Sequence, residues 1–292
     1  MGNSFAEKIS LEVNGLGFDG LALGPQSGAL ILFLHGFPEF ADSWTEVMAP
    51  LAKQGFRTVA INQRGYSAGA RPALIEQYAG ELLVADTVGF ATALSAERFH
   101  LVGHDWGGAI AWRVAAMHPE RLLSLTVLAT PHPDAFAHAL RNDADQRRRS
   151  EYFALFRASD HAAEKLLLAE EARLLRSVYQ GMLPQANIEE YVQRFSEDGT
   201  LTAALNWYRA MKVGFATGPI QVPTMYIWGD QDMALGEAAA LATRDYVASS
   251  FRFERMTGKS HWLMAECPEQ IAALVQDQCS GAAADKPNSV SS

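Results

Sequence analysis

The hydrophobic residues of this chain form short continuous runs that are separated by stretches with helical spacing. Residues 7–14 alternate polar and apolar side chains, which is typical of an edge strand, and a turn and a second short strand follow at 15–24. Further runs are apolar throughout, as expected for strands buried on both faces of a parallel sheet. These runs are 29–34, 56–61, 99–102 and 122–128. Helical patterns occupy 43–54, 76–95 and 109–116. Strands that alternate with helices predict βαβ units with right-handed crossovers.

The alternation stops after the run at 122–128. From residue 134 to residue 218 the apolar residues recur only at helical spacing, and the strand pattern resumes at 222–228 and 251–256. We therefore predict an α/β core, residues 1–133 and 219–279, that is interrupted by a helical cap, residues 134–218. The last segment, residues 280–292, is small and polar and predicts a disordered tail.

Composition narrows the class of protein. The chain has 292 residues, of which 49% are hydrophobic, and a formal net charge of −9. An acidic chain argues against nucleic acid as a partner. No apolar run approaches the roughly 18–20 residues that span a bilayer, and the N-terminus lacks the apolar segment of a signal peptide. Two cysteines, Cys267 and Cys279, make neither a disulfide framework nor a zinc site. We expect a soluble cytoplasmic protein that does not bind membranes. The sequence does not determine whether it forms a homodimer.

The motif GHDWGG, residues 103–108, lies between an apolar run and a helical pattern. Strand, glycine-flanked turn and helix is the layout of a nucleophile elbow, in which the turn lifts one side chain clear of the sheet. Serine is usual at that position, but this chain has Asp105. A carboxylate can attack an electrophilic sp³ carbon and form an ester with the enzyme, whereas serine attacks a carbonyl group. Asp105 therefore indicates an epoxide or an alkyl halide as substrate. The competing interpretation is an aspartate that caps the following helix.

Three more loops with reactive side chains follow predicted strands: HGFPE at 35–39, GDQD at 229–232 and GKSHW at 258–262. In an open parallel sheet, ligands bind beyond the carboxyl ends of the strands, so these loops are expected to meet around Asp105. The order nucleophile, acid, histidine is that of hydrolases with a nucleophile elbow. His261 is the candidate base, because imidazole titrates near neutral pH. Asp232 or Asp230 would orient it. We expect His104 and His35 to have structural roles.

Together these motifs resemble the epoxide hydrolase branch of the α/β-hydrolase fold family. The resemblance covers residues 7 to 278, and it rests on HGFPE, GHDWGG, GDQD, SHW at 260–262 and the run Asn206-Trp207-Tyr208-Arg209. It implies an α/β-hydrolase fold, with a mostly parallel central sheet flanked by helices and a helical cap. It favours Asp232 as the acid. In some relatives the acid follows the preceding strand, which makes Asp134 a further candidate. The resemblance also implies that the backbone N–H groups of Phe37 and Trp106 form the oxyanion hole.

The leaving group separates the two substrate classes. An epoxide oxygen leaves as a basic alkoxide and needs a proton donor, which a tyrosine with a pKa of about 10 can be. By resemblance, Tyr208 and Tyr152 in the cap are these donors, whereas Tyr179 and Tyr191 look like ordinary helix residues.

Two departures from related families also favour an epoxide. Haloalkane dehalogenases often carry asparagine where this chain has Phe37, and fluoroacetate-type relatives tend to have arginine in place of Trp106. We predict hydrolysis of a small apolar epoxide by water to a vicinal diol, with a haloalkane dehalogenase as the alternative. The expected pocket walls are Trp106, Phe37, Phe156 and Trp262. Neither a metal nor an organic cofactor is expected, because no His/Cys cluster and no phosphate-binding glycine loop stands out.

Overall fold

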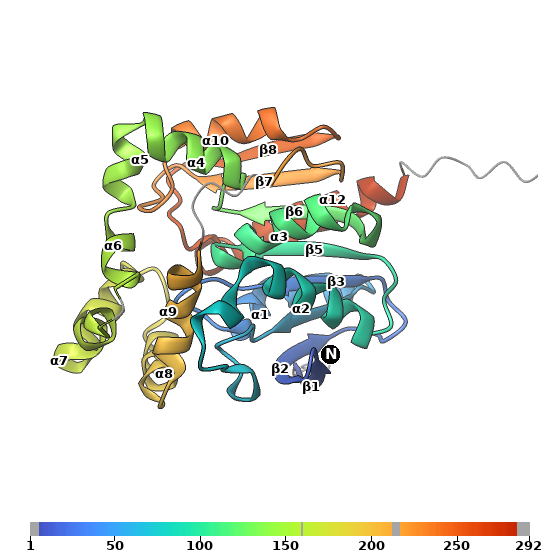
Figure 1. Ribbon diagram of the computed structural model, residues 1–292. Helices are drawn as coiled ribbons and strands as arrows, with labels where there is room; N and C mark the ends of the chain where they lie inside the picture. The colour runs from blue at the N-terminus through green and yellow to red at the C-terminus, as the bar shows by residue number, and fades with distance from the viewer. Residues whose placement is uncertain (1–5, 159, 212–216, 285–292) are drawn as a thin grey trace, which may run out of the picture.

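The structure, a computed structural model, describes residues 6–158, 160–211 and 217–284. The N-terminal residues 1–5, on which the prediction about a signal peptide depends, and residues 285–292 of the predicted tail lie outside this part. A central eight-stranded sheet carries helices on both faces (Figure 1). Its strand order is β1-β2-β4-β3-β5-β6-β7-β8, with β1, β2 and β4 paired antiparallel and all other neighbours parallel. The mostly parallel sheet predicted from the apolar runs is confirmed.

The strands begin and end close to the predicted runs. They are β1 Glu7–Val13, β2 Leu16–Leu23, β3 Leu30–Leu34, β4 Arg57–Ile61, β5 Phe99–His104, β6 Leu122–Leu128, β7 Thr224–Gly229 and β8 Phe251–Met256. Strand β3 is buried along its whole length. Leu32 and Leu34 join the hydrophobic cluster on one face of the sheet, and Ile31 and Phe33 join the cluster on the other face. This division explains the unbroken apolar run, because successive side chains of a strand point to opposite faces.

Helices cover the two faces unequally. On one face lie α2 Gly80–Ala93 and α3 Trp106–Met117, and on the other lie α1 Thr45–Lys53, α11 Leu263–Glu266 and α12 Pro268–Ala284. Helix α10, Glu237–Ala242, lies near the edge formed by β7 and β8 (Figure 1). Short 3₁₀ turns occupy Ala41–Trp44, Ala68–Ala70, Ile75–Tyr78, Pro119–Arg121 and Thr243–Tyr246.

Two predicted boundaries are wrong. The helix predicted at 76–95 begins only at Gly80, because Ala79 has extended backbone (φ −59°, ψ 144°) that separates it from the 3₁₀ turn before it. The tail was predicted from Ser280, but α12 continues to Ala284. Residues 282–284 are alanines, which have the highest helix propensity and favour continuation of the helix.

Six helices lie between β6 and β7 in the described residues of this connection. They are α4 Pro133–Asn142, α5 Ala144–Arg149, α6 Tyr152–Phe156, α7 Ala162–Val178, α8 Gln185–Ser196 and α9 Thr200–Ala210. Helix α4 packs against α10, whereas α6 to α9 lie at the edge of the sheet where β5 ends (left in Figure 1). The Trp207 indole N–H on α9 donates to the Arg64 carbonyl oxygen (2.8 Å), which fixes α9 over that edge. None of the helices in the described residues is long and apolar enough to cross a bilayer.

Candidate active site

Asp105 occupies a strained turn between β5 and α3. Its backbone has φ 51° and ψ −120°, which side chains other than glycine rarely adopt. The turn is so tight that a Cβ on Gly107 would lie 2.2 Å from the Leu34 carbonyl oxygen, and a Cβ on Gly36 would lie 2.3 Å from Cβ of Asp105. Only glycine fits these two positions. The chain therefore presents the Asp105 carboxylate above the sheet, as the nucleophile-elbow motif predicts.

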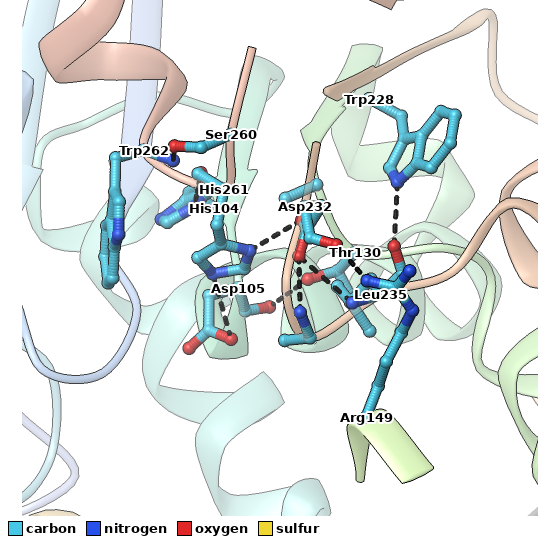
Figure 2. Close-up of polar contacts among 12 residues, drawn as sticks. His104, Asp105, Thr130, Arg149, Trp228, Asp232, Leu235, Ser260, His261 and Trp262 are labelled. Atoms are coloured by element: carbon cyan, nitrogen blue, oxygen red, sulfur yellow. Dashed lines mark hydrogen bonds and ion pairs between the residues drawn. The ribbon is translucent and has the colours of Figure 1, made fainter. Parts of the chain in front are cut away.

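The structure brings together Asp105, His261 and Asp232 (Figure 2). Nδ1 of His261 lies 2.7 Å from Oδ2 of Asp232, and Nε2 lies 3.6 Å from Oδ2 of Asp105. The other oxygen of Asp232 accepts hydrogen bonds from the backbone N–H groups of Ala234 (2.8 Å) and Leu235 (3.0 Å). The His261 imidazole is thus held between two carboxylates, and backbone N–H groups fix the carboxylate of Asp232.

The two alternative acids bind elsewhere. Oδ1 of Asp230 accepts from the Gly258 N–H at 2.8 Å. The Asp134 carboxylate accepts from the N–H groups of Thr217 and Gly218 at 3.1–3.2 Å. The geometry therefore favours Asp232 as the partner of the histidine.

One proposed oxyanion donor already contacts the nucleophile. The Phe37 N–H donates to Oδ1 of Asp105 at 2.8 Å. Trp106 is the first residue of α3, where backbone N–H groups have no partner within the helix. Its part as the second donor stays a prediction.

The charges around His261 stabilise its protonated form. Burial lowers its pKa, but the carboxylates of Asp232 and Asp105 outweigh burial and hold the pKa well above the ordinary value. Burial raises the pKa of Asp105, but contact with His261, the nearby His104 and the Phe37 N–H bring it below the ordinary value. Both shifts favour an ionised Asp105 beside a protonated His261. Conversion of Asp105 to a neutral ester would remove one cause of the raised pKa and favour the neutral imidazole, which is the form that can accept a proton from water.

Tyr208 and Tyr152 line the same cavity as Asp105. The Tyr208 ring packs edge-on against Trp106 (centroids 4.9 Å apart) and lies 6.3 Å from the Tyr152 ring. Burial, together with nearby Asp105, raises the pKa of each hydroxyl well above the usual value. Both hydroxyls therefore keep their protons at neutral pH and are available as hydrogen-bond donors.

A cavity of about 150 Å³ joins these groups. Asp105, Trp106, Tyr152 and Tyr208 line it, and its other walls are mainly apolar. The remaining apolar wall residues include Leu83, Ala109, Ile110, Phe136, Leu140 and Leu235. Most of these come from α2, α4 and the part of α3 beyond the GHDWGG motif, where the sequence shows only ordinary helical patterns.

Three of the four predicted pocket walls are wrong. Phe37, Phe156 and Trp262 do not line this cavity. Their side chains are only 5%, 7% and 1% exposed. The Phe37 ring turns into an aromatic cluster with Phe156 and Tyr208 (centroids 5.6 and 5.7 Å away), and the Trp262 ring packs edge-on against His261. These rings pack in the hydrophobic cluster next to the loops that carry Phe37 and His261, and they do not line the cavity.

Sequence reasoning named Glu39 within the HGFPE motif but gave it no role; in the structure it pairs with His104, which contacts the backbone of His261. His104 donates from Nε2 to the His261 carbonyl oxygen (2.9 Å), and its Nδ1 lies 3.2 Å from the Glu39 carboxylate. Glu39 is 2% exposed. A glutamate that directly follows the HGFP turn at a strand end was the available signal. His35 supports its loop as predicted: its Nε2 accepts from the Gln63 N–H at 3.2 Å.

Comparison with known proteins identifies the family to which this chain belongs. The family model described as alpha/beta hydrolase fold matches residues 29–266, so the chain belongs to that family. Epoxide hydrolase 4 of Mus musculus is 33% identical over 283 residues, which cover 91% of this chain and 77% of the relative. The AB hydrolase superfamily protein YfhM of Bacillus subtilis is 33% identical over 272 residues, 91% of this chain and 95% of the relative. The crystal structure of Bacillus megaterium epoxide hydrolase in complex with an inhibitor superimposes with a TM-score of 0.84 at 26% identity, over 93% of this chain and 100% of that one. Within the fold family, the chain belongs to the epoxide hydrolase branch.

Proposed function

We propose that this enzyme hydrolyses an epoxide to a vicinal diol through an ester on Asp105. One observation carries the mechanism: the Asp105 carboxylate and the two protonated tyrosines, Tyr208 and Tyr152, line the same small cavity. An epoxide held there has a nucleophile at a ring carbon and acids at its oxygen. The core, residues 1–133 and 219–279, would supply the nucleophile and the base, and the cap, residues 134–218, would supply the acids.

In the first step, Oδ2 of Asp105 attacks a ring carbon and the carbon–oxygen bond of the ring breaks. Tyr208, assisted by Tyr152, donates its proton to the leaving oxygen, which becomes the first hydroxyl of the product. The charge of Asp105 is now lost in the ester. The imidazolium of His261 therefore releases its proton to solvent. Solvent in turn returns a proton to the Tyr208 hydroxyl.

In the second step, His261 takes a proton from water while the water oxygen attacks Cγ of Asp105. Negative charge develops on the ester carbonyl oxygen, Oδ1 of Asp105, which faces the Phe37 N–H. Asp232 stabilises the imidazolium that forms. Collapse of the tetrahedral intermediate expels the second diol oxygen, which takes the proton from His261. Asp105 then carries one oxygen from water and the second water proton. This proton passes to Nε2 of His261, which restores the Asp105 carboxylate and the imidazolium.

Isotope labelling tests the ester. A single turnover of styrene oxide in H₂¹⁸O, with enzyme in excess, is expected to place the label in Asp105 and to leave the first diol unlabelled. Mass spectrometry of the diol and of the peptide that carries Asp105 measures both. Label in the first diol would mean direct attack by water. Bromide release from 1-bromobutane without diol from styrene oxide would instead establish the dehalogenase.

Replacing Tyr208 by phenylalanine is expected to slow ring opening about 100-fold, because general acids typically contribute 10²–10⁴-fold. Ester hydrolysis should change little, since the tyrosine acts on the first leaving group. Rapid-quench kinetics measure the two steps separately. Tyr78→Phe is the matched control: Tyr78 lines the same cavity, but its hydroxyl donates to the Pro72 carbonyl oxygen at 2.9 Å. Equal slowing of both steps in Tyr208→Phe would count against its role as the acid.

A further inference from the structure

The cap residue Tyr179 contacts the loop that carries the Phe37 N–H. It directly follows α7, and its side chain is fully buried. Its hydroxyl donates to the Pro38 carbonyl oxygen at 2.6 Å. Pro38 is the neighbour of Phe37, whose N–H contacts Oδ1 of Asp105. Tyr179, predicted to be an ordinary helix residue, thus touches the proposed oxyanion hole from the cap side.

The same ring also reaches the histidine loop. Its centroid lies 5.5 Å from that of Trp262, the residue after His261. Figure 2 shows Trp262 on the side of His261 away from Asp232. One cap side chain therefore packs between the loop of the oxyanion donor and the loop of the base.

The loop around Phe37 packs so tightly against Asp105 that a shift of the loop would change its contacts with the carboxylate. Gly36 approaches Asp105 so closely that no Cβ fits there. The Pro38 carbonyl oxygen is buried, so loss of the Tyr179 hydroxyl would leave it without this donor. The loop would then turn to find another partner, and the Phe37 N–H would move relative to the Asp105 oxygen.

We propose that Tyr179 is a positioning residue that holds the oxyanion loop in place from the cap, so that the oxyanion hole is complete only when the cap is seated. This inference rests on the proposed function, because it takes the Phe37 N–H as an oxyanion donor. Negative charge leaves the Asp105 oxygens during ester formation and returns to one of them during ester hydrolysis. A misplaced donor therefore harms the second step and spares the first.

The test is Tyr179→Phe, which removes the hydroxyl and keeps the ring on Trp262. Ester hydrolysis should slow about 10-fold, less than the 10²–10³-fold for complete loss of an oxyanion donor. Ester formation should stay within about 2-fold. In steady state, kcat and KM should fall together and leave kcat/KM nearly unchanged, since kcat/KM reports on ester formation. Rapid-quench kinetics with styrene oxide, and the mass of the Asp105 peptide, measure these quantities.

Tyr191→Phe is the matched control. The Tyr191 ring lies 6.1 Å from that of Tyr179 and is equally buried. In the part of the chain that the structure describes, its hydroxyl makes no hydrogen bond to residues 36–39. This variant should keep both rates. A second variant, Tyr179→His, retains a ring and a donor and should recover part of the hydrolysis rate. If Tyr179→Phe does not fold, Tyr179→His is compared with wild type by the same two rates.

The inference is overturned if Tyr179→Phe lowers kcat/KM as much as kcat, which is the behaviour of a generally loosened site. It is also overturned if Tyr179→Phe and Tyr191→Phe are alike, or if ester hydrolysis keeps its rate. Absence of diol or of an Asp105 ester with the wild-type enzyme would instead contradict the proposed function.

Discussion

Replacing Asp105 by alanine is expected to lower kcat/KM for styrene oxide by about 10⁴-fold or more, as loss of a catalytic nucleophile does in other hydrolases. The variant has no atom that can form the ester, and a water molecule in its place would be unactivated at the ring carbon. The smaller side chain fits beside Gly36, and the fold should be retained. Diol formation measured by chromatography, together with thermal unfolding, checks both statements.

Asp230→Ala is the control for this variant. Asp230 also follows a parallel strand, but its carboxylate accepts from the Gly258 N–H and does not face the cavity. We expect its kcat/KM to stay within about 3-fold of wild type, since it touches no reacting atom. If Asp105→Ala kept activity within 10-fold of wild type, hydrolysis would have to proceed by direct attack of water, and the ester mechanism would be wrong.

Replacing His261 by glutamine is expected to trap the ester. General bases contribute typically 10²–10⁴-fold, so ester hydrolysis should slow about 10³-fold. Ester formation needs only the carboxylate and the tyrosines, and it should continue. Without the histidine beside it, burial would raise the pKa of Asp105, so ester formation is measured over a range of pH. The enzyme should therefore retain up to one equivalent of substrate per site as the Asp105 ester and release almost no diol.

Mass spectrometry of the peptide with Asp105 measures this intermediate as an increment equal to the mass of the epoxide. His100→Gln is the control, because His100 is also buried but pairs with the Ser124 hydroxyl (2.8 Å) away from the site. It should turn over without accumulating ester. A His261→Gln enzyme that loses ester formation and ester hydrolysis equally would show that the histidine also serves the first step.

Local sequence signals located the chemistry but not its surroundings. Asp105 and His261 were predictable because each lies in a short loop after a buried strand, and parallel strands bring such loops to one edge of the sheet. The loop 229–232 offered both Asp230 and Asp232 to the histidine. Their two-residue separation left the direction of each side chain open until the turn was seen to point Asp232 at Nδ1 of His261.

The aromatic residues were harder to place. Phe37, Phe156 and Trp262 suit a pocket wall or a core equally well by composition, and the structure buries all three. Whether such a ring lines the pocket or packs in the core depends on how it packs against rings from loops that are distant in the sequence. The α2, α3 and α4 residues that line the cavity instead follow ordinary helical patterns. The division into core and cap at 134–218 stays a prediction.

By itself, the sequence determined the order of strands and helices, the nucleophile elbow and the identity of its carboxylate. These features depend on hydrophobic periodicity and on glycines that lie within a few residues of one another. Both are local properties of the sequence and can be recognised without the tertiary structure. Only the tertiary structure decided the acid partner, the walls of the cavity, the Glu39–His104 support and the contact of Tyr179 with Pro38. That last contact joins residues 141 positions apart. Such contacts depend on the packing of whole elements and on side-chain rotamers, and no local pattern encodes either of them.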